Sequence, residues 1–310
     1  MTIHSIIFIL LVCLGVARHS RLSSLFMPFL FAVVLAVGLA GCDNDDNMVD
    51  DGGDEISCPD QYAVLVHGSK GFYYYRHLAD VLNVYQLLRK NGFDDDHIIL
   101  IIDCALANDS LNKEPGIIRI SPEGQDLLGG TDGLPKAEVD YDAADLTPAD
   151  ISDIIQNVGS KGHNVLLYWS GHGSRGYFSW RDTKEGFTAD RLRQTVEAMT
   201  FRKLFVVTET CRGESVISSL EGLRGVLAMS SAASKEDSYA DNWNASMQVW
   251  MCDQFTKNMV DFLSANPPCT FNELYDYTRE HTVNSHVQLV NADCFGDLST
   301  ESPAEFFTKQ

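Results

Sequence analysis

Five short apolar segments rich in β-branched residues constrain the fold of this 310-residue chain more than any other feature. They lie at 61–69 (QYAVLVHGS), 97–103 (HIILIID), 164–169 (NVLLYW), 203–209 (KLFVVTE) and 225–230 (GVLAMS). Runs of this length without polar alternation are typical of strands buried on both faces of a parallel sheet. Because helical patterns alternate with these segments, we predict an α/β fold in which helices cover both faces of a mainly parallel sheet.

The segments between the strands carry helix signals. Residues 75–92 place an apolar stripe on one helical face and end at Gly92, a common C-cap residue. Thr147 followed by Pro148 is typical of an N-cap and first helical turn. Further predictions are a long surface excursion over 104–146, a hairpin around 176–180, a helix from Thr188 to about Met199, and late helices near 246–264 and 271–282.

The N-terminal part of the chain resembles a bacterial lipoprotein signal. Arg18 and Arg21 precede an apolar run that closes on small residues and Cys42. The resemblance implies that residues 1–41 form the signal peptide and that Cys42 is lipidated. The mature protein is then anchored to a membrane by the lipid, in the cell envelope outside the cytoplasm. A plain transmembrane anchor with an incidental cysteine is the alternative, and whether residues 1–17 follow from a misassigned start stays open.

The residues after Cys42 divide into a tether and a single folded domain. Residues 42–57 are nearly all Asp, Asn and Gly and are too polar to bury a core, so we predict an acidic tether there. Residues 58–310 are long enough for one large domain. The formal net charge of the chain is −20, which repels polyanions and argues against nucleic acid as a partner.

The cysteines give no sign of a metal site. The chain has eight cysteines but no CxxC pair and no Cys/His pair at ligand spacing, so we predict neither a metal nor another cofactor. Export would permit disulfides. Their pairing stays open.

Cys211 and His172 are the clearest candidates for catalytic residues. His172 follows the strand predicted at 164–169, and Cys211 follows the strand predicted at 203–209. Sites form at the carboxyl ends of parallel strands, so the two side chains are expected at the same edge of the sheet. There the imidazole can accept and return a proton while the sulfur attacks a carbonyl. The backbone N–H groups of Gly173 and Cys211 are candidates to stabilise the oxyanion. Taken singly, a loop histidine and a buried structural cysteine are the ordinary alternatives.

Four stretches resemble those of the legumain (asparaginyl endopeptidase) family, which also contains the catalytic subunit of the glycosylphosphatidylinositol transamidase. The four are GSKGFYYYRHLAD (68–80), YWSGHGSRG (168–176), TETCRGES (208–215) and SSAASKEDSYAD (230–241). The similarity covers roughly residues 60–300. It implies a caspase-like α/β/α sandwich with Cys211 as the nucleophile and His172 as its proton-managing partner.

The resemblance also implies a pocket for the substrate residue before the scissile bond, the P1 residue. Arg76, His77 and Glu209 would form it, and Ser238 and Asp241 would complete it. A pocket with both signs of charge suits asparagine, because a guanidinium donates to the amide oxygen while a carboxylate accepts from the NH2 group. The alternative is that Arg76 only pairs with an acidic neighbour at the start of a helix.

Three departures from the legumain pattern bear on this site. Tyr74 stands where legumain has an asparagine two residues before the arginine, Gly171 precedes the histidine in place of aspartate, and Asp237 replaces a serine. Residues 137–151 and the C-terminal tail lean towards the transamidase branch. Strict preference for asparagine is therefore an open point.

These features together predict a lipid-anchored cysteine endopeptidase that cleaves peptides or proteins after Asn, or Asp, through an acyl-enzyme. The alternative is a transamidase that passes the acyl group to an amine. A third interpretation is an inactive binding module at the cell surface. It predicts that the nucleophile or its histidine has been lost, yet both are present. No sequence feature indicates an obligate protein partner.

Overall fold

Seven strands form the central sheet of the computed structural model, which describes residues 60–130, 133–159, 163–266 and 268–309. The predicted signal peptide, Cys42 and the tether lie outside these residues. The order across the sheet is β12 (Gln288–Val290), β9 (Val226–Ser230), β8 (Lys203–Glu209), β4 (Asn164–Ser170), β1 (Gln61–His67), β2 (Ile98–Ile102) and β3 (Tyr141–Asp142). All neighbours run parallel except β12 and β9. The predicted mainly parallel α/β sheet is therefore confirmed.

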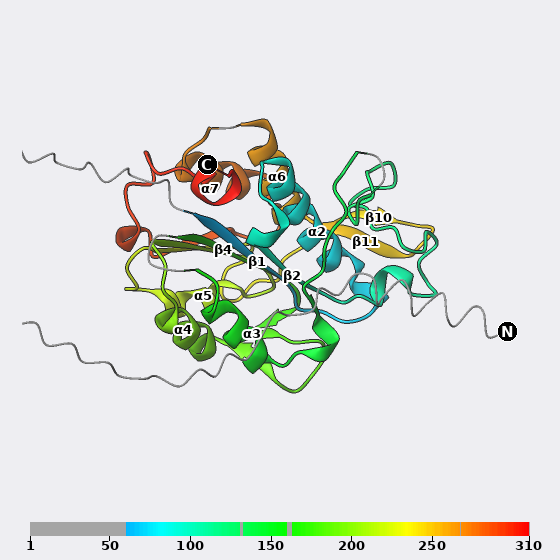
Figure 1. The fold of residues 1–310 in the computed structure, drawn as a ribbon, viewed down its shortest axis with the longest axis horizontal. Helices are drawn as coiled ribbons and strands as arrows, with labels where there is room; N and C mark the ends of the chain where they lie inside the picture. Colours follow the sequence, from blue (N-terminus) through cyan, green and yellow to red (C-terminus); the bar gives the residue numbers. More distant parts are fainter. Residues whose placement is uncertain (1–59, 131–132, 160–162, 267, 310) are drawn as a thin grey trace, which may run out of the picture. The chain divides into compact units, whose positions relative to one another are not determined.

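Helices cover both faces of the sheet (Figure 1). One face carries α2 (Tyr75–Lys90), α6 (Gln254–Ala265), α7 (Phe271–His281) and α8 (Ala304–Phe307). The other face carries α3 (Pro148–Gln156), α4 (Ala189–Ala198) and α5 (Glu214–Ile217). The predicted N-cap is present, because Thr147 forms a capping box with Asp150. The helix predicted from Thr188 begins at Ala189, and Thr188 is its N-cap, accepting a hydrogen bond from the Arg191 N–H.

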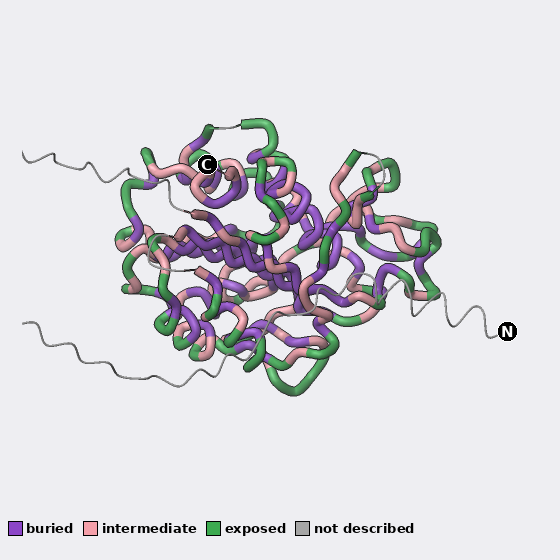
Figure 2. Tube along the Cα trace, in the orientation of Figure 1, coloured by how far each residue is buried: buried purple, intermediate pink, exposed green. Residues whose placement is uncertain are grey.

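Successive strand residues supply two separate cores. Leu65 and Val207 face the α2 side, whereas Val66 and Val206 face the α3 side. Figure 2 shows the central strands as continuously buried. This double burial explains why the strand sequences lack polar alternation.

Two smaller β units flank the main sheet. The hairpin predicted around 176–180 is part of a three-stranded unit of β5 (Gly173–Ser174), β6 (Tyr177–Ser179) and β7 (Gly186–Thr188). The second unit pairs β10 (Ala240–Asn244) with β11 (Val249–Asp253). The excursion over 104–146 contains a short 3-10 turn at Leu106–Asn108 and the edge strand β3.

The helix predicted near 246–264 is wrong in its first part. Residues 249–253 form β11, and α6 begins only at Gln254. Val249 and Met251 are buried while Trp250 between them is exposed, which is the period of a strand. Asn244 closes the preceding turn by accepting from the Ser246 and Met247 N–H groups.

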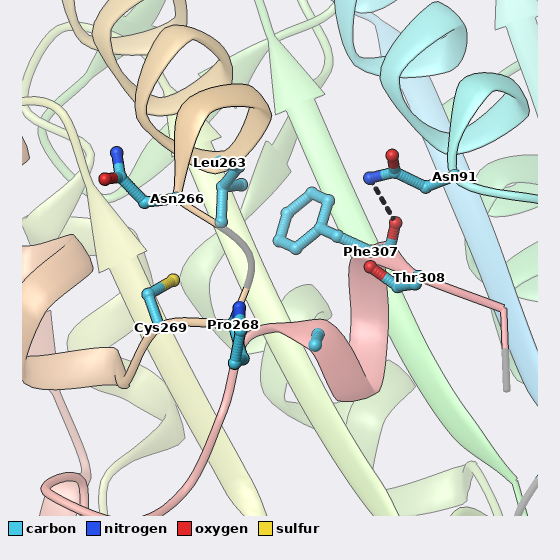
Figure 3. A pocket seen from close by; sticks show the side chains of 8 residues that line it. Asn91, Leu263, Asn266, Pro268, Cys269, Phe307 and Thr308 are labelled. Carbon is cyan, nitrogen blue, oxygen red and sulfur yellow. Dashed lines mark hydrogen bonds between the residues drawn. The ribbon is translucent and has the colours of Figure 1, made fainter.

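The C-terminal segment closes the amino end of β1. Gln61 Nε2 donates to the carbonyl oxygens of Glu305 and Thr308, at 3.0 and 2.8 Å. Figure 3 shows the small pocket beside this contact, where Asn91 Nδ2 donates to the Phe307 carbonyl at 2.9 Å. Among the described residues, none of the helices is both long and apolar enough to cross a membrane.

Phe205 tests the packing of the α2-side core. It is fully buried, and its ring lies 5.0 Å from Phe271 and 5.7 Å from Phe306. Replacing it by alanine leaves a cavity, so Phe205→Ala should lower the free energy of unfolding by about 3–5 kcal/mol. Urea unfolding measures the change. Val283→Ala, at a residue 57% exposed, is the control, and an equal loss in both variants would contradict this account.

Candidate active site

The order of the strands creates a switch point between β1 and β4. From β1 the chain proceeds to β2 and β3 on one side, whereas β4 is followed by β8 and β9 on the other. Loops that leave the carboxyl ends of such strands diverge and open a crevice, which is where open α/β sheets bind ligands. Arg76 and His77 come after β1, His172 follows β4, and Cys211 follows β8, which ends at Glu209. Ser238 and Asp241 come after β9.

The loops that carry His172 and Cys211 are in direct contact. A Cβ atom at Gly173 would lie 2.3 Å from the Cys211 carbonyl oxygen, so the approach requires glycine. The His172 N–H donates to Ser69 Oγ at 3.3 Å, which ties its loop to the one after β1. Both predicted catalytic residues therefore lie at the same edge of the sheet, and each is half-buried.

Two backbone N–H groups in these loops have no acceptor among the described residues. The Ser179 N–H donates to the His172 carbonyl, and hydrogen-bonded pairs alternate along an antiparallel ladder. The next pair, Gly173 with Phe178, is therefore not hydrogen-bonded, and the Gly173 N–H points away from β6. Cys211 N–H, outside any helix or strand, likewise has no acceptor there. Both groups are available to an oxyanion, and that role remains a prediction.

Burial favours the neutral forms of both catalytic candidates. It raises the pKa of the Cys211 thiol above its ordinary value. It also lowers the pKa of the His172 imidazole, and the nearby Arg76 guanidinium lowers it further. A neutral imidazole can accept the proton of a neutral thiol as the sulfur attacks, so the pair is suited to general-base activation.

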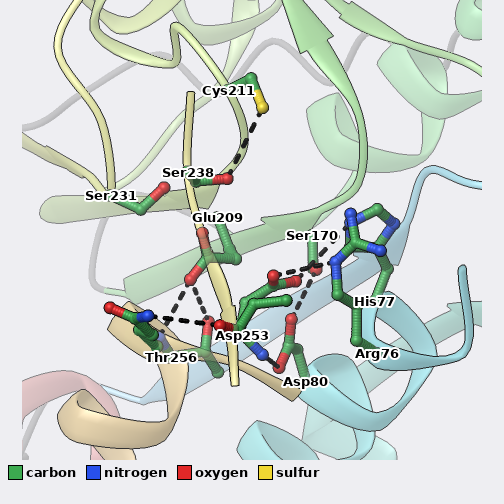
Figure 4. Close-up of polar contacts among 12 residues, drawn as sticks. Arg76, His77, Asp80, Ser170, Glu209, Cys211, Ser231, Ser238, Asp253 and Thr256 are labelled. Atoms are coloured by element: carbon green, nitrogen blue, oxygen red, sulfur yellow. Dashed lines mark hydrogen bonds and ion pairs between the residues drawn. The ribbon is translucent and has the colours of Figure 1, made fainter. Parts of the chain in front are cut away.

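Asp253 connects the predicted pocket residues (Figure 4). Arg76 Nε donates to Asp253 Oδ1 at 2.9 Å, and His77 Nε2 lies 3.6 Å from Asp253 Oδ2. His77 Nδ1 is 2.8 Å from Ser69 Oγ, the hydroxyl that also holds the His172 N–H. Burial lowers the pKa of His77 well below its usual value, so its ring is neutral.

Asp253 was not predicted from the sequence. It is the last residue of β11 and is only 2% exposed. The wrong helix prediction over 246–264 concealed it, because within a helix it is one polar residue among several. As the end of a strand with buried Met251 and Cys252 before it, an aspartate would have stood out.

Glu209 and Asp80 lie beneath this contact. Glu209 Oε2 accepts from the Thr256 N–H at 3.1 Å, and burial together with Asp253 raises the pKa of Glu209 to about 8. Asp80 accepts from the Asp253 N–H at 3.0 Å and from Ser170 Oγ at 3.1 Å. Burial, Asp253 and Glu209 raise the pKa of Asp80 well above its usual range. Glu209 and Asp80 thus both adjoin Asp253, the carboxylate that pairs with Arg76.

The guanidinium of Arg76 keeps hydrogen-bonding capacity. Only its Nε takes part in the bond to Asp253, and its two terminal NH2 groups have no acceptor among the described residues. The ion pair agrees with both interpretations of Arg76, as a structural pair and as a substrate-binding group. Glu209 Oε1 is likewise buried without a partner there.

The two remaining predicted residues differ in position. Ser238 Oγ lies 3.8 Å from Cys211 Sγ, beside the nucleophile. Asp241 is not brought into the cluster, since its carboxylate lies 4.0 Å from Lys257 Nζ and accepts from the Asn242 N–H. The aspartate that contacts Arg76 is Asp253 and not Asp241.

Arg212 fastens the Ser238 loop to the nucleophile loop. Its N–H donates to the Glu236 carbonyl at 2.8 Å, and its guanidinium pairs with Asp237 at 2.9 Å. Asp237, one of the departures from legumain, therefore faces Arg212. After it, Gly213 admits no side chain, because a Cβ there would lie 2.2 Å from Ser230 Oγ.

Residues 61–301 match the family model described as the Peptidase C13 family. The chain belongs to this family. It is 26% identical over 303 residues to a GPI-anchor transamidase of Saccharomyces cerevisiae, covering 91% of this chain and 70% of that protein. It is 27% identical over 276 residues to the legumain of Homo sapiens, covering 83% and 60%. The predicted resemblance is confirmed, whereas its lipoprotein aspect stays a prediction.

This member of the C13 peptidase family also resembles a second transamidase and a solved caspase structure. A putative GPI-anchor transamidase of Drosophila melanogaster is 29% identical over 260 residues, covering 77% of this chain and 72% of that protein. Among solved structures, caspase-1 from Spodoptera frugiperda matches with a TM-score of 0.47 and 12% identity over 82% of this chain and 91% of that one. At that score the likeness carries no argument. Family membership supports a cysteine peptidase, and the chain spans 60% of the length of human legumain.

The raised pKa of Glu209 gives a prediction for stability against pH. Folding raises this pKa from 4.5 to about 8, so the folded state binds an extra proton between these values and the free energy of unfolding falls as the pH rises through them. Glu209→Gln cannot ionise and should flatten that fall, while Asp80 preserves part of it. Urea unfolding at pH 5, 6.5 and 8 measures the slope. Glu221→Gln, at an exposed residue, should keep the wild-type slope; equal slopes in all three proteins would contradict the assignment.

Proposed function

We propose that this chain is a cysteine endopeptidase that cleaves peptide bonds after Asn, or after Asp, through an acyl-enzyme at Cys211. The observation that carries the proposal is a pair of opposite charges, Arg76 and Asp253, which His77 and Ser69 link to the loop of His172. Ser238 Oγ lies 3.8 Å from the sulfur of Cys211 in the neighbouring loop. We infer that the charge pair binds the P1 side chain while Cys211 attacks the scissile bond.

The pocket supports recognition of a carboxamide. The free NH2 groups of Arg76 are donors for the amide oxygen, and the Asp253 carboxylate beside them is the acceptor for the amide NH2. An ionised aspartate side chain gains the guanidinium but is repelled by the Asp253 carboxylate, so Asn is the better substrate at neutral pH. A hydrophobic P1 residue would leave these buried polar atoms unsatisfied, which costs affinity.

The chemistry follows from the neutral dyad. His172 accepts the Cys211 proton as the sulfur bonds to the scissile carbonyl carbon, and the N–H groups of Gly173 and Cys211 hold the resulting oxyanion. Collapse breaks the C–N bond, and His172 returns the proton to the leaving amine. Water, deprotonated by His172, then attacks the thioester, and the acid product leaves as the thiol is reprotonated.

Transfer to an amine is the second candidate. An amine in place of water would resolve the same acyl-enzyme, and the relatives named GPI-anchor transamidase match this chain about as well as the legumains do. The geometry of the dyad and pocket suits either acceptor, since both reactions share the acyl-enzyme. The products formed with an added amine decide between them.

Peptide cleavage tests the proposal. The purified protein should cleave a peptide library after Asn with hydroxylamine or an amino acid amide added, and mass spectrometry identifies water or amine products. Cys211→Ala should abolish turnover. Asp253→Asn should lower kcat/KM at least about tenfold, mainly through KM, because Arg76 loses its carboxylate partner. Asp276→Asn, on the surface, is the matched control; cleavage without regard to P1, or turnover without Cys211, would refute the proposal.

We also propose that Cys42 is lipidated and anchors the protein to a membrane of the cell envelope. The support is the sequence pattern of arginines, apolar run, small residues and cysteine before an acidic segment. The full chain expressed in a bacterium should sediment with membranes and carry acyl chains on the peptide that begins at Cys42. The Cys42→Ser protein should carry no acyl chains and should not sediment with membranes. A wild-type peptide without acyl chains would contradict the proposed anchor.

A further inference from the structure

We propose that Tyr74 is a positioning residue for His172, which it holds by an edge-to-face ring contact and not by a hydrogen bond. The inference rests on the proposed catalytic role of His172. Tyr74 ends the 3-10 turn Phe72–Tyr74 after β1 and immediately precedes α2. At this position the chain departs from the legumain pattern, and the structure shows which group occupies it.

Two rings flank the imidazole. The Tyr74 and His172 ring centroids are 4.2 Å apart with an interplanar angle of 89°, and His77 and His172 are 5.0 Å apart at 90°. Tyr74 and His77 are themselves nearly parallel, at 13° and 6.0 Å. Edge-to-face aromatic pairs usually have centroids about 4.5–7 Å apart, so the Tyr74 contact is a tight one. Rotation of the His172 ring about its Cβ–Cγ bond would collide with both neighbours.

The backbone holds Tyr74 firmly in this position. Its N–H donates to the Gly71 carbonyl at 3.1 Å. The next residue, Tyr75, is 1% exposed, and its hydroxyl accepts from the Arg119 N–H at 2.6 Å. The ring that contacts His172 is thus carried by a turn that is fixed on both sides.

Among the described residues, no polar group holds the His172 ring by a hydrogen bond. Its Nε2 is buried without a hydrogen-bond partner among the described residues, and the Tyr74 hydroxyl makes no hydrogen bond there. A carboxamide at position 74 would offer an oxygen acceptor to an imidazole N–H and so favour the protonated ring. A phenol ring in edge-to-face contact restricts the orientation of the imidazole and excludes water from it. Tyr74 therefore positions a neutral base.

Charged and titratable groups from several elements also face His172. They are Arg76 and His77 of α2, Asp182 after β6 and Asp253 at the end of β11. The backbone of Cys211, after β8, contacts Gly173, the residue that follows His172. Arg76 opposes protonation of the imidazole, whereas the two aspartates favour it. Burial acts in the same direction as Arg76 and is the larger effect, so the pKa of His172 lies below its ordinary value. Removing the Tyr74 ring would expose the imidazole and reduce that effect.

Variants of Tyr74 in the full-length protein test the proposal. Tyr74→Ala should lower kcat at least about tenfold with KM changed less than about twofold, because orientation of the base is lost and the pocket is not. The acidic limb of the kcat/KM profile should move to higher pH. Tyr74→Phe keeps the ring and should recover most of the loss. Tyr74→Asn should recover turnover but raise the pKa of His172. Tyr73→Ala, at a neighbouring ring that is 68% exposed, is the matched control.

Two measurements without a substrate separate this proposal from the proposed function. Histidine-detected NMR follows the titration of His172, and mass spectrometry follows alkylation of Cys211 by iodoacetamide. If no protein cleaves peptides but Tyr74→Ala still raises the His172 pKa, the proposed function fails and the ring contact stands. Wild-type kinetics and titration in Tyr74→Ala would overturn the proposal. Equal damage in Tyr74→Phe and Tyr74→Ala would also overturn it, by assigning the effect to the hydroxyl. A melting temperature for each variant confirms that it is folded.

Discussion

The Asp253 carboxylate, shared between Arg76 and His77, is the interaction on which the candidate site depends. It joins the end of β11 to the first turn of α2, two elements separated by about half of the chain. Asp80 holds the Asp253 backbone from below, and His77 passes the restraint through Ser69 to the loop of His172. Buried charge is tolerated here because each group has a partner of opposite sign or is held in its neutral form.

The same network joins the proposed pocket to the proposed dyad. Ser69 contacts the His77 ring and accepts from the backbone N–H of His172, so a shift in either histidine would affect the other. Arg212 and Asp237 place the Ser238 loop over the nucleophile in the same way. A change in the pocket should therefore affect both binding and orientation, which are separable only by comparing kcat with KM.

The sequence was sufficient for features governed by local pattern. The buried strands, the cap at Thr147, the helix after Thr188 and the placement of His172 and Cys211 after strands follow from periodicity, capping signals and the rule for parallel sheets. The contact of Asp253 with Arg76 was not accessible in this way, because it joins residues that are distant in sequence. The family resemblance implied Asp241 instead, yet its carboxylate lies near Lys257. The alternation of apolar positions over 249–251, which indicates a strand, was the signal that the sequence prediction missed. The physical reason for a departure from the legumain pattern is visible only in the structure. At Gly171, for example, a Cβ would lie 3.2 Å from Gly68 Cα, which leaves little room for an aspartate.

The clasp between Gln61 and the C-terminal carbonyls has a geometric consequence. It fixes the point where the polypeptide enters the sheet, at the amino end of β1, whereas the crevice opens at the carboxyl end. Seven residues at about 3.3 Å each separate the two edges by roughly 20 Å. The polypeptide therefore enters the sheet at the edge opposite the loops that carry His172 and Cys211, and a substrate can reach those loops without passing the entry point.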